Sequence, residues 1–342
     1  MVRSNNLKVI IHGYFGFGNV GDEAILSVII DEFRRSFGDV EFVVLSSNPK
    51  RTMKLHKVKA IKERLTSLNF WRSYLRFHVL VFAGGGRYGY ATWRRMGLLA
   101  LIARLLGKVI VFRAMGVYPY NWRGSPVLSP RPMPFKGLTG LLIRLAISKA
   151  SYVSVRDKYS YLVLRLTGVK KHIIVENDLA FRLKLPDSSM CKVLAVKYNI
   201  TGSKVLGINL RTLDYETNKR VINYVVKLLQ DLVKNGFNKV IFIPFGFGSF
   251  ENRFFDNDLI VAKLLKEYIP NLIIIEKELS PKEVLCLFNY LDYVIAMRHH
   301  AIIFALMTNK PMIALVYDTK TLELLRNLNK DDVKLLLIND IV

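Results

Sequence analysis

Acidic residues are scarce in this 342-residue chain, and one long stretch has none. The sequence contains 27 Asp and Glu against 51 Lys and Arg, which gives a formal net charge of +24. Residues 64–156 carry 15 Lys and Arg and no acid. A strongly positive protein surface favours an anionic partner: nucleic acid, an anionic membrane face, or a phosphorylated or acidic substrate. A generally basic proteome would give the same charge, so charge alone does not choose among these.

Cysteine is almost absent, with Cys191 and Cys286 as the only two. Their spacing matches no paired pattern, which argues against a disulfide framework and against a cysteine-based metal site. Two unpaired cysteines suit a reducing cytoplasm. We therefore expect a cytoplasmic protein, and the basic stretch leaves peripheral association with the inner face of the membrane open.

Long hydrophobic runs are also missing. The most apolar stretch is residues 96–112, MGLLALIARLLGKVIVF, which Arg104 and Lys108 interrupt. It falls short of the ~20 apolar residues that span a bilayer, and it predicts a buried helix followed by a strand. Residues 68–77, LNFWRSYLRF, interleave aromatics with arginine. On a short helix this pattern suits a lipid headgroup region, unless the aromatics belong to the core.

Short β-branched runs alternate with helical patterns along the chain, which predicts parallel sheets covered by helices. There are two series of runs, so we expect two Rossmann-like domains, over residues 1–190 and 204–342, with a helix at the C-terminus. The polar segment 184–204 is the expected join. The predicted strands are 9–12, 41–46, 79–83, 109–113, 152–155 and 173–176, then 205–210, 239–244, 272–275, 293–296 and 311–316.

A glycine loop follows the first predicted strand. Residues 13–26, GYFGFGNVGDEAIL, contain a G-x-G-x-x-G pattern of Gly16, Gly18 and Gly21. A dinucleotide site needs an acid about 20 residues on, where this chain has Ser46 and Ser47. Asp22 and Glu23 would repel a pyrophosphate and accept hydrogen bonds from hydroxyls. The loop therefore favours a sugar, although Asp22 could also serve as the N-cap of the next helix.

A second glycine cluster, Gly84, Gly85 and Gly86 in VFAGGGRYGY, ends the third predicted strand. Glycine lets a ligand or another chain approach the backbone closely, and a tight strand exit has the same requirement. Glycine turns at two strand ends indicate a crevice at the carboxyl edge of the sheet.

The second half carries cationic residues at strand ends. Arg298 and His300 lie between a strand and a helix in AMRHHAIIFAL, and Lys320 follows the next strand. Arginine supplies a planar fork, lysine a point charge and histidine a proton near neutral pH, so these three predict an anion site. His299 is adjacent, but neighbours in sequence point apart. Arg211 also follows a strand, in GINLRTL.

The segment YVSVRDKYSY repeats this pattern in the first half. Arg156 and Asp157 follow a strand and open a helix. Asp157 could cap the helix and orient Arg156, or the two could form a surface pair that contributes little energy.

Taken together, these segments resemble the polysaccharide pyruvyl transferase family. The matching segments occur in family order over nearly the whole chain: GYFGFGNVGDEAIL, FAGGG, AMGV, VSVRD, LTGV, NDLAF, GINLR, MRHHAIIFAL and YDTK. The resemblance implies a glycosyltransferase-B-like α/β fold, with two Rossmann-like domains around a cleft. It also implies transfer of the pyruvate unit of phosphoenolpyruvate to two hydroxyls of one sugar, giving a ketal and phosphate. Acceptors in the family are often polymeric or lipid-linked glycans.

The resemblance assigns roles by position. Arg156, His300 and Lys320 become the phosphoenolpyruvate and catalytic residues, while Asp22 lies on the acceptor side. His300 is the expected general acid, and Asp22 is the expected base or hydroxyl-orienting group. The other expected substrate-binding residues are Arg211, Arg298, Gly16, Gly18, Gly21, Gly84, Gly85 and Gly86. With phosphoenolpyruvate as donor substrate, the chemistry requires no metal or cofactor.

Three segments depart from the family pattern. The chain has Arg298, His299 and His300 where the family often has Arg-Leu-His, RYGY after the triple glycine, and YPYNW after AMGV. The last two concern the acceptor half. Two other functions remain open: a nucleotide-sugar glycosyltransferase on the same architecture, and a non-catalytic protein that binds anionic glycan or membrane. The sequence has no recognised nucleic-acid motif, so nucleic acid is not an expected partner.

Overall fold

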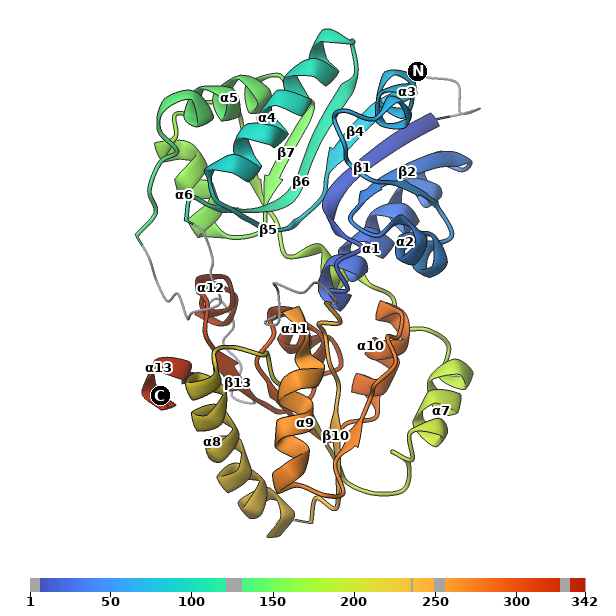
Figure 1. Ribbon diagram of the computed structural model, residues 1–342, viewed down its shortest axis with the longest axis vertical. Coiled ribbons are helices and arrows are strands. Elements are labelled where there is room, and N and C mark those ends of the chain that lie inside the picture. The colour runs from blue at the N-terminus through green and yellow to red at the C-terminus, as the bar shows by residue number, and fades with distance from the viewer. Residues whose placement is uncertain (1–6, 121–130, 235, 249–255, 327–332, 342) are drawn as a thin grey trace. The chain divides into compact units, whose positions relative to one another are not determined.

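The structure of the protein, a computed structural model, describes residues 7–120, 131–234, 236–248, 256–326 and 333–341. The chain forms two compact units. Of the described residues, 7–17, 22–120 and 131–182 belong to the first unit, and 18–21 and 183–341 to the second. In Figure 1 the first unit runs from blue to green and the second from yellow-green to red.

The first unit is built on a parallel sheet with the strand order β3-β2-β1-β4-β6-β7-β8, and β5 pairs with β6. Its strands are β1 (Leu7–Phe15), β2 (Val40–Ser46), β3 (Lys59–Ile61), β4 (Val79–Phe82), β5 (Gly85–Tyr88), β6 (Val109–Tyr118), β7 (Tyr152–Val155) and β8 (Ile174–Val175). Its helices are α1 (Val20–Phe37), α2 (Pro49–His56), α3 (Leu68–Arg76), α4 (Tyr90–Leu105), α5 (Gly137–Ser148) and α6 (Lys158–Leu166), followed by a 3-10 turn, Leu179–Arg182.

The second unit contains a parallel sheet with the strand order β11-β10-β9-β12-β13-β14. The strands are β9 (Val205–Asn209), β10 (Lys239–Phe242), β11 (Ile273–Ile274), β12 (Tyr293–Ala296), β13 (Met312–Val316) and β14 (Val333–Leu337). The helices are α7 (Ser188–Lys197), α8 (Tyr215–Lys234), α9 (Asp258–Tyr268), α10 (Pro281–Asn289), α11 (His299–Met307), α12 (Thr319–Arg326) and α13 (Ile338–Ile341).

Numbered within its unit, the second sheet follows the order 3-2-1-4-5-6 of the doubly wound fold, and the first sheet follows the same order through β7 when the short β5 is left out of the numbering. The predicted α/β fold with two Rossmann-like domains is therefore confirmed. In such sheets the strand order reverses next to the first strand, and ligands bind beyond the carboxyl ends at that point. These positions lie between β1 and β4 in the first unit, and between β9 and β12 in the second.

The structure corrects the expected role of residues 68–77. They form helix α3, but Phe70, Tyr74 and Phe77 are buried in the core of the first unit. The Tyr74 hydroxyl donates a hydrogen bond to the backbone oxygen of Leu99, and the indole of Trp71 donates to that of Leu65. The aromatics therefore belong to the core and are not available to lipid headgroups.

The structure also corrects the expectation for residues 96–112. They form most of α4 and the start of β6, as predicted, but α4 is buried on one face only. Leu98 and Leu105 on its outer face are exposed. None of the described helices is long and apolar enough to cross a membrane.

The segment between the two sheets differs from the sequence expectation in two ways. Residues 188–197, expected within a polar linker, form α7, and the second unit begins at Leu183. Cys191 on α7 and Cys286 on α10 form a disulfide, so the expectation of unpaired cysteines is wrong. Their proximity arises because α7 packs on α10, which the spacing of 95 residues does not reveal.

Candidate active site

The glycine loop of the first unit is held by a buried carboxylate. Gly16 has a positive φ of 76°, and its backbone N–H donates a 2.8 Å hydrogen bond to Oε1 of Glu23. Oε2 of Glu23 lies 2.7 Å from Nε2 of His56, and both side chains are buried. Glu23 therefore shapes the loop from inside and does not present its carboxylate to a sugar, contrary to expectation.

Residues 18–21 cluster with the second unit. The backbone N–H of Val20, the first residue of α1, donates a 2.9 Å hydrogen bond to the backbone oxygen of Phe245. A Cβ atom on Gly21 would overlap the imidazole of His300, so glycine is required at this position by that contact. Because α1 begins at Val20, Asp22 lies in its first turn and is not the N-cap.

The triple glycine opens a short strand, β5, that pairs with the extended β6. Gly85 has a φ of 93°, and a Cβ atom there would lie 2.5 Å from Oδ1 of Asp22. Arg87 on the same strand is buried, and its Nη2 donates to the backbone oxygen of Ala83. Burial lowers the pKa of Arg87, and the negative charges of Asp22 and Glu63 offset part of that effect. Asp22 thus has a buried cation close by.

Arg156 follows β7 and lies in a network of buried polar groups. Its Nη1 donates to Oδ2 of Asp178 at 3.0 Å, and its Nη2 donates to the Tyr118 hydroxyl at 3.2 Å. That hydroxyl donates in turn to Oδ2 of Asp157 at 2.9 Å. Asp157 is the N-cap of α6 and accepts a 2.6 Å hydrogen bond from the backbone N–H of Ser160. The predicted cap is therefore confirmed, and the Arg–Asp pair is buried, not superficial.

Arg298 precedes α11 in the second unit, and its guanidinium is held by Asp258 of α9. Nε lies 3.0 Å from both carboxylate oxygens, and Nη2 lies 2.5 Å from Oδ1. Burial works to lower the pKa of Arg298, but the Asp258 charge and hydrogen bonds raise it above its usual value. Oδ2 of Asp258 also accepts the backbone N–H groups of Phe245 and Gly246. Arg298 therefore helps to fix the turn after β10.

Arg211 follows β9 and is held in a similar way. Nη1 donates to the Tyr317 hydroxyl at 2.9 Å, and Nη2 donates to Oδ1 of Asp256 at 3.1 Å. Asn209, at the end of β9, accepts the backbone N–H of Arg298 and donates to the backbone oxygen of Ile243. These contacts join the two strands at which the strand order of the second sheet reverses.

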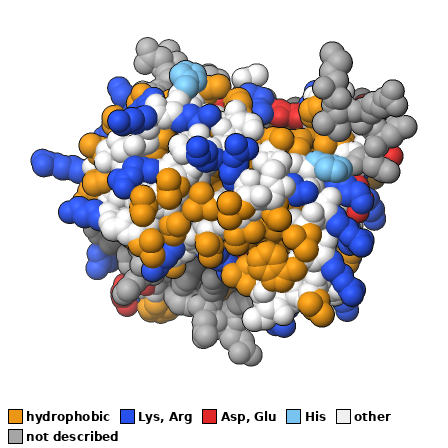
Figure 2. Space-filling view, turned by 90° about the horizontal axis from the view of Figure 1, so that it is seen from above, with side chains coloured by type: hydrophobic (Ala, Val, Ile, Leu, Met, Phe, Trp, Pro, Cys, Tyr) orange, Lys and Arg blue, Asp and Glu red, His pale blue; other side chains and the backbone are white. Residues whose placement is uncertain are grey.

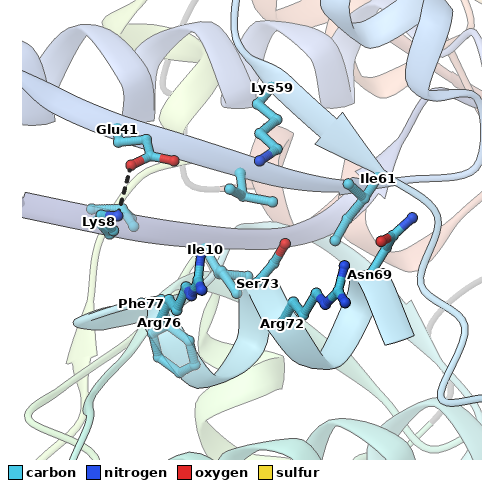
Figure 3. A pocket seen from close by; sticks show the side chains of 12 residues that line it. Lys8, Ile10, Glu41, Lys59, Ile61, Asn69, Arg72, Ser73, Arg76 and Phe77 are labelled. Carbon is cyan, nitrogen blue, oxygen red and sulfur yellow. Dashed lines mark ion pairs between the residues drawn. The ribbon is translucent and has the colours of Figure 1, made fainter. Parts of the chain in front are cut away.

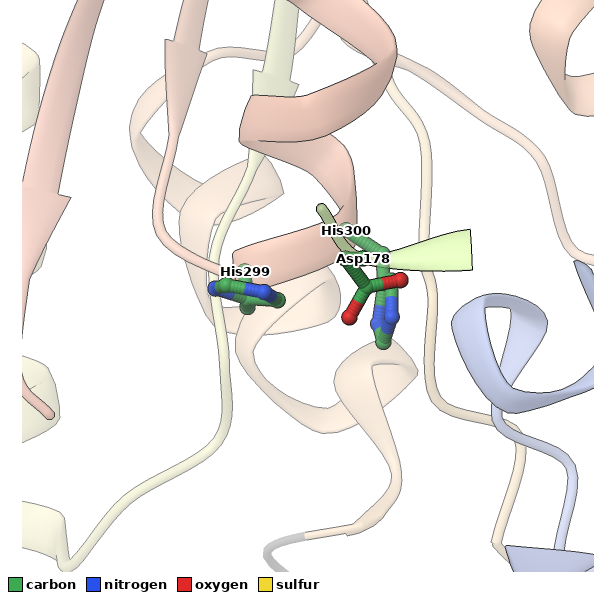
Figure 4. Close-up of side chains that lie close together, drawn as sticks. All are labelled: Asp178, His299 and His300. Carbon is green, nitrogen blue, oxygen red and sulfur yellow. The ribbon is translucent and has the colours of Figure 1, made fainter. Parts of the chain in front are cut away.

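The paired histidines at the start of α11 point in different directions (Figure 4). Their ring planes make an angle of 83°. Nδ1 of His299 lies 3.3 Å from the Thr321 hydroxyl, on the side of Asp318 and Lys320. His300 instead packs against Gly21.

Lys320 lies in the first turn of α12, and its Nζ is 3.1 Å from Oδ2 of Asp318. Burial works to raise the pKa of Asp318, but the charges of Lys320 and His299 and hydrogen bonds from Thr321 lower it to about 2. Arg211, Arg298, His300 and Lys320 thus follow the carboxyl ends of β9, β12 and β13, where the sequence placed them, and His299 lies beside His300.

The backbone at the start of α11 adds to this group. Arg298 occupies the N-cap position, and its own side chain makes no capping hydrogen bond. The first N–H groups of a helix have no partner within the helix and carry a partial positive charge. The N-terminus of α11 can therefore bind an anionic group.

The sequence interpretation missed several charged residues in the first unit, near the triple glycine. His12 near the end of β1 pairs with Glu63, at 3.1 Å from Nε2 to Oε2, and Glu63 also pairs with Arg95. Burial works to raise the pKa of Glu63, but His12, Arg95 and Arg87 lower it. Arg87 directly follows the triple glycine, and that position was the available signal. Nothing in the sequence pairs His12 with Glu63.

A separate cavity of about 390 Å³ lies in the first unit, alongside the amino halves of β1 and β2 (Figure 3). One wall is the polar face of α3, with Arg72, Ser73 and Arg76, and Lys59 of β3 points in from the other side. The cavity therefore uses the side of α3 that does not face the core.

Comparison with solved structures supports the fold. The UDP-GlcNAc 2-epimerase of Methanocaldococcus jannaschii is 14% identical and covers 98% of this chain and 89% of its own, with a TM-score of 0.59. The Neisseria meningitidis enzyme of the same name, bound to UDP-GlcNAc, is 14% identical, covers 98% of this chain and 89% of its own, and has a TM-score of 0.58. Anabaena HepE in complex with UDP is 13% identical, covers 98% of this chain and 88% of its own, and has a TM-score of 0.54. These likenesses show a glycosyltransferase-B-like fold. A search of curated proteins found no match.

The sequence profile of polysaccharide pyruvyl transferases matches residues 19–319. This chain belongs to the polysaccharide pyruvyl transferase family. The matched region includes Asp22, the triple glycine, Arg156 and the segment from Arg298 to Thr319, and it ends one residue before Lys320.

Proposed function

We propose that this protein transfers the pyruvate unit of phosphoenolpyruvate to two hydroxyls of one sugar in a glycan or lipid-linked glycan. The product is a pyruvate ketal, and phosphate is released. The observation that carries the proposal is the family match over residues 19–319, which contains Asp22, Arg156, Arg211, Arg298 and His300 and ends one residue before Lys320. No metal or cofactor takes part in the proposed reaction.

The donor is assigned to the second unit. Phosphoenolpyruvate carries a phosphate and a carboxylate, so its site must present positive charge and hydrogen-bond donors. Lys320 and the N-terminus of α11 supply these, while Arg211 and Arg298 keep their fixed positions through Asp256 and Asp258. The family resemblance also assigns Arg156 to the donor, with its guanidinium oriented by Asp178 and Tyr118.

The reaction needs two proton movements. Protonation of the methylene carbon turns it into a methyl group and creates an oxocarbenium-like centre at C2. One sugar hydroxyl attacks C2 and loses its proton, and a second hydroxyl then displaces phosphate, which takes up the other proton. His300 is the proposed general acid, or the group that protonates the departing phosphate. Asp22 is the proposed base or hydroxyl-orienting group, with Arg87 near its carboxylate.

The test is a product assay. Phosphoenolpyruvate is supplied with a panel of free and lipid-linked sugars, and mass spectrometry detects the added pyruvate unit. We expect phosphate release only with an acceptor present, because water reaching the oxocarbenium-like centre would give free pyruvate. A sugar with one hydroxyl of the relevant pair blocked should be inert.

Two outcomes would contradict the proposal. Release of phosphate and pyruvate without acceptor would indicate a hydrolase. Transfer from a nucleotide sugar, with phosphoenolpyruvate ignored, would indicate a glycosyltransferase. The second outcome has a concrete motive, since the solved structures with this fold include complexes with UDP and UDP-GlcNAc.

A further inference from the structure

The outer faces of α4 and α5 in the first unit are apolar. On α4 the outward positions at helical spacing include Leu98, Leu101 and Leu105, and on α5 they include Leu138, Leu141 and Leu145. Leu105 is 87% exposed and Leu138 is 60% exposed. Residues at i, i+3, i+4 and i+7 lie on one face of a helix, and on a solvent-facing side that face is normally polar. These helices reverse that pattern.

The two apolar faces belong to adjacent helices. A Cβ atom on Gly97 of α4 would lie 3.0 Å from Cβ of Leu142 on α5. Glycine at this position therefore lets the helices pack closely, which brings their leucine rows together. The result is one continuous apolar surface, and surfaces of this kind mark interaction sites in soluble proteins. We call it the α4–α5 surface.

Basic residues border the α4–α5 surface. Arg94 and Arg104 lie on α4, Arg144 lies on α5, and Lys108, Lys136 and Lys149 lie just beyond the ends of these helices. The whole stretch 64–156 contains no acidic residue. On the face drawn in Figure 2, hydrophobic side chains gather between Lys and Arg side chains, and few acidic ones appear. A partner for this surface must therefore combine apolar groups with negative charge.

We propose that the α4–α5 surface docks on an anionic lipid bilayer, with its leucines at the boundary of headgroups and acyl chains and its Lys and Arg at the lipid phosphates. The spacing of leucines and cations is that of helices that lie in a membrane interface. A second copy of the chain would bring the same cations face to face, so charge complementarity favours lipid. In this arrangement α4 and α5, and not α3, contact the lipid. Lipid binding does not depend on the proposed pyruvyl transfer.

Vesicle flotation tests the apolar part. The protein is mixed with phosphatidylcholine vesicles that contain or lack phosphatidylglycerol, without donor or acceptor. We expect binding to the anionic vesicles, and a loss of affinity of about tenfold for each leucine in Leu105→Ser/Leu138→Ser. The matched control is Val193→Ser/Val196→Ser on α7, where the side chains are 68% and 60% exposed. It should bind like the wild type.

A second pair of variants tests the charges. Arg94→Gln/Arg104→Gln on α4 should weaken binding by about fivefold per arginine at low salt, with the effect shrinking as salt rises. Arg72→Gln/Arg76→Gln on α3 removes the same charge and should have a smaller effect. Equal binding to neutral and anionic vesicles, or equal losses in the leucine variant and its control, would overturn the proposal. So would self-association through this surface without vesicle binding.

Discussion

Two strand–helix junctions of this protein have the same sequence pattern and different chemistry. In the first unit, β7 leads through Arg156 and Asp157 into α6, and the Asp157 carboxylate occupies the helix N-terminus. In the second unit, β12 leads through Arg298 into α11, and the Arg298 side chain at the N-cap makes no capping hydrogen bond. Both arginines are buried and held by carboxylates.

We call the β7–α6 junction at Asp157 the closed junction and the β12–α11 junction at Arg298 the open junction. At α6 the protein supplies its own anion, because Oδ1 of Asp157 accepts the N–H of Ser160. At α11 the N-cap residue is a cation, Arg298, whose charge is balanced by Asp258 from the side, and helix N-termini favour phosphates and carboxylates. We therefore favour the second unit for the proposed donor. The comparison also gives arginines at strand ends a bracing role that sequence patterns do not distinguish from ligand binding.

The largest expected effect concerns Asp258, whose carboxylate holds the Arg298 guanidinium at the open junction. Asp258→Ala would leave Arg298 buried without its carboxylate, and would free the N–H groups of Phe245 and Gly246. We expect a loss of about 3–5 kcal/mol in the free energy of unfolding, measured by urea denaturation. Asp187→Ala, at an exposed N-cap without a side-chain hydrogen bond, should stay within about 0.5 kcal/mol of wild type. Similar losses in both variants would refute the bracing role.

The next effect concerns the open junction itself. His300→Ala should lower turnover by about 100-fold or more if His300 transfers a proton. His299 points away from His300 and toward Thr321, so His299→Ala should lower it by less than about tenfold. Initial rates of phosphate release with acceptor present measure both. Normal turnover in His300→Ala would remove this residue from the mechanism.

A pH effect of intermediate size is expected at Asp318. Its pKa of about 2 in the folded protein lies below the ordinary value of about 3.9 for an unfolded chain. Ionised Asp318 therefore contributes stability above about pH 4, and this contribution is lost as pH falls toward 2. Compared with Asp318→Asn, the wild type should be more stable by about 2 kcal/mol at neutral pH, with the difference shrinking in acid. A difference that does not change with pH would contradict the assignment.

The smallest effect concerns the closed junction. Asp157→Ala removes the N-cap of α6 and should cost about 1 kcal/mol of stability, measured by thermal or urea unfolding. Asn48→Ala at the N-cap of α2 should cost a similar amount, because Asn48 accepts an equivalent bond from the N–H of Arg51. If the N-terminus of α6 bound an anion in Asp157→Ala, the Asp157 carboxylate alone would account for the difference between the two junctions.

Much of the fold could be predicted because both sheets are made of buried, β-branched strands between helices. Three strands, β3, β5 and β14, lie outside the predicted ranges. β3 is short, and β5 contains two glycines, so neither carries a strand-like pattern. The burial of the α3 aromatics and the exposure of α4 depend on which helix face meets the sheet. Composition does not determine that.

For the candidate site, the sequence predicted where the charged side chains lie better than it predicted which residues they contact. Strand ends indicated where Arg156, Arg298 and Lys320 lie, because parallel strands bring their carboxyl ends to one edge. Their partners were not predicted: Asp178 and Asp318 lie in the matching segments NDLAF and YDTK, but a sequence pattern does not show that they pair with Arg156 and Lys320, and Asp258 lies in no matching segment. The Cys191–Cys286 disulfide likewise joins two helices that only the folded structure brings together.

The most direct test of the account is calorimetric titration of phosphoenolpyruvate into two variants without an acceptor. The account assigns the donor to the second unit, through Lys320, and the acceptor to the first, through Asp22. Lys320→Ala should weaken binding by about tenfold or more, because a hydrogen bond to a charged group contributes about 1.5–3 kcal/mol, and Asp22→Ala should bind like the wild type. Unchanged binding in Lys320→Ala together with lost binding in Asp22→Ala would contradict it.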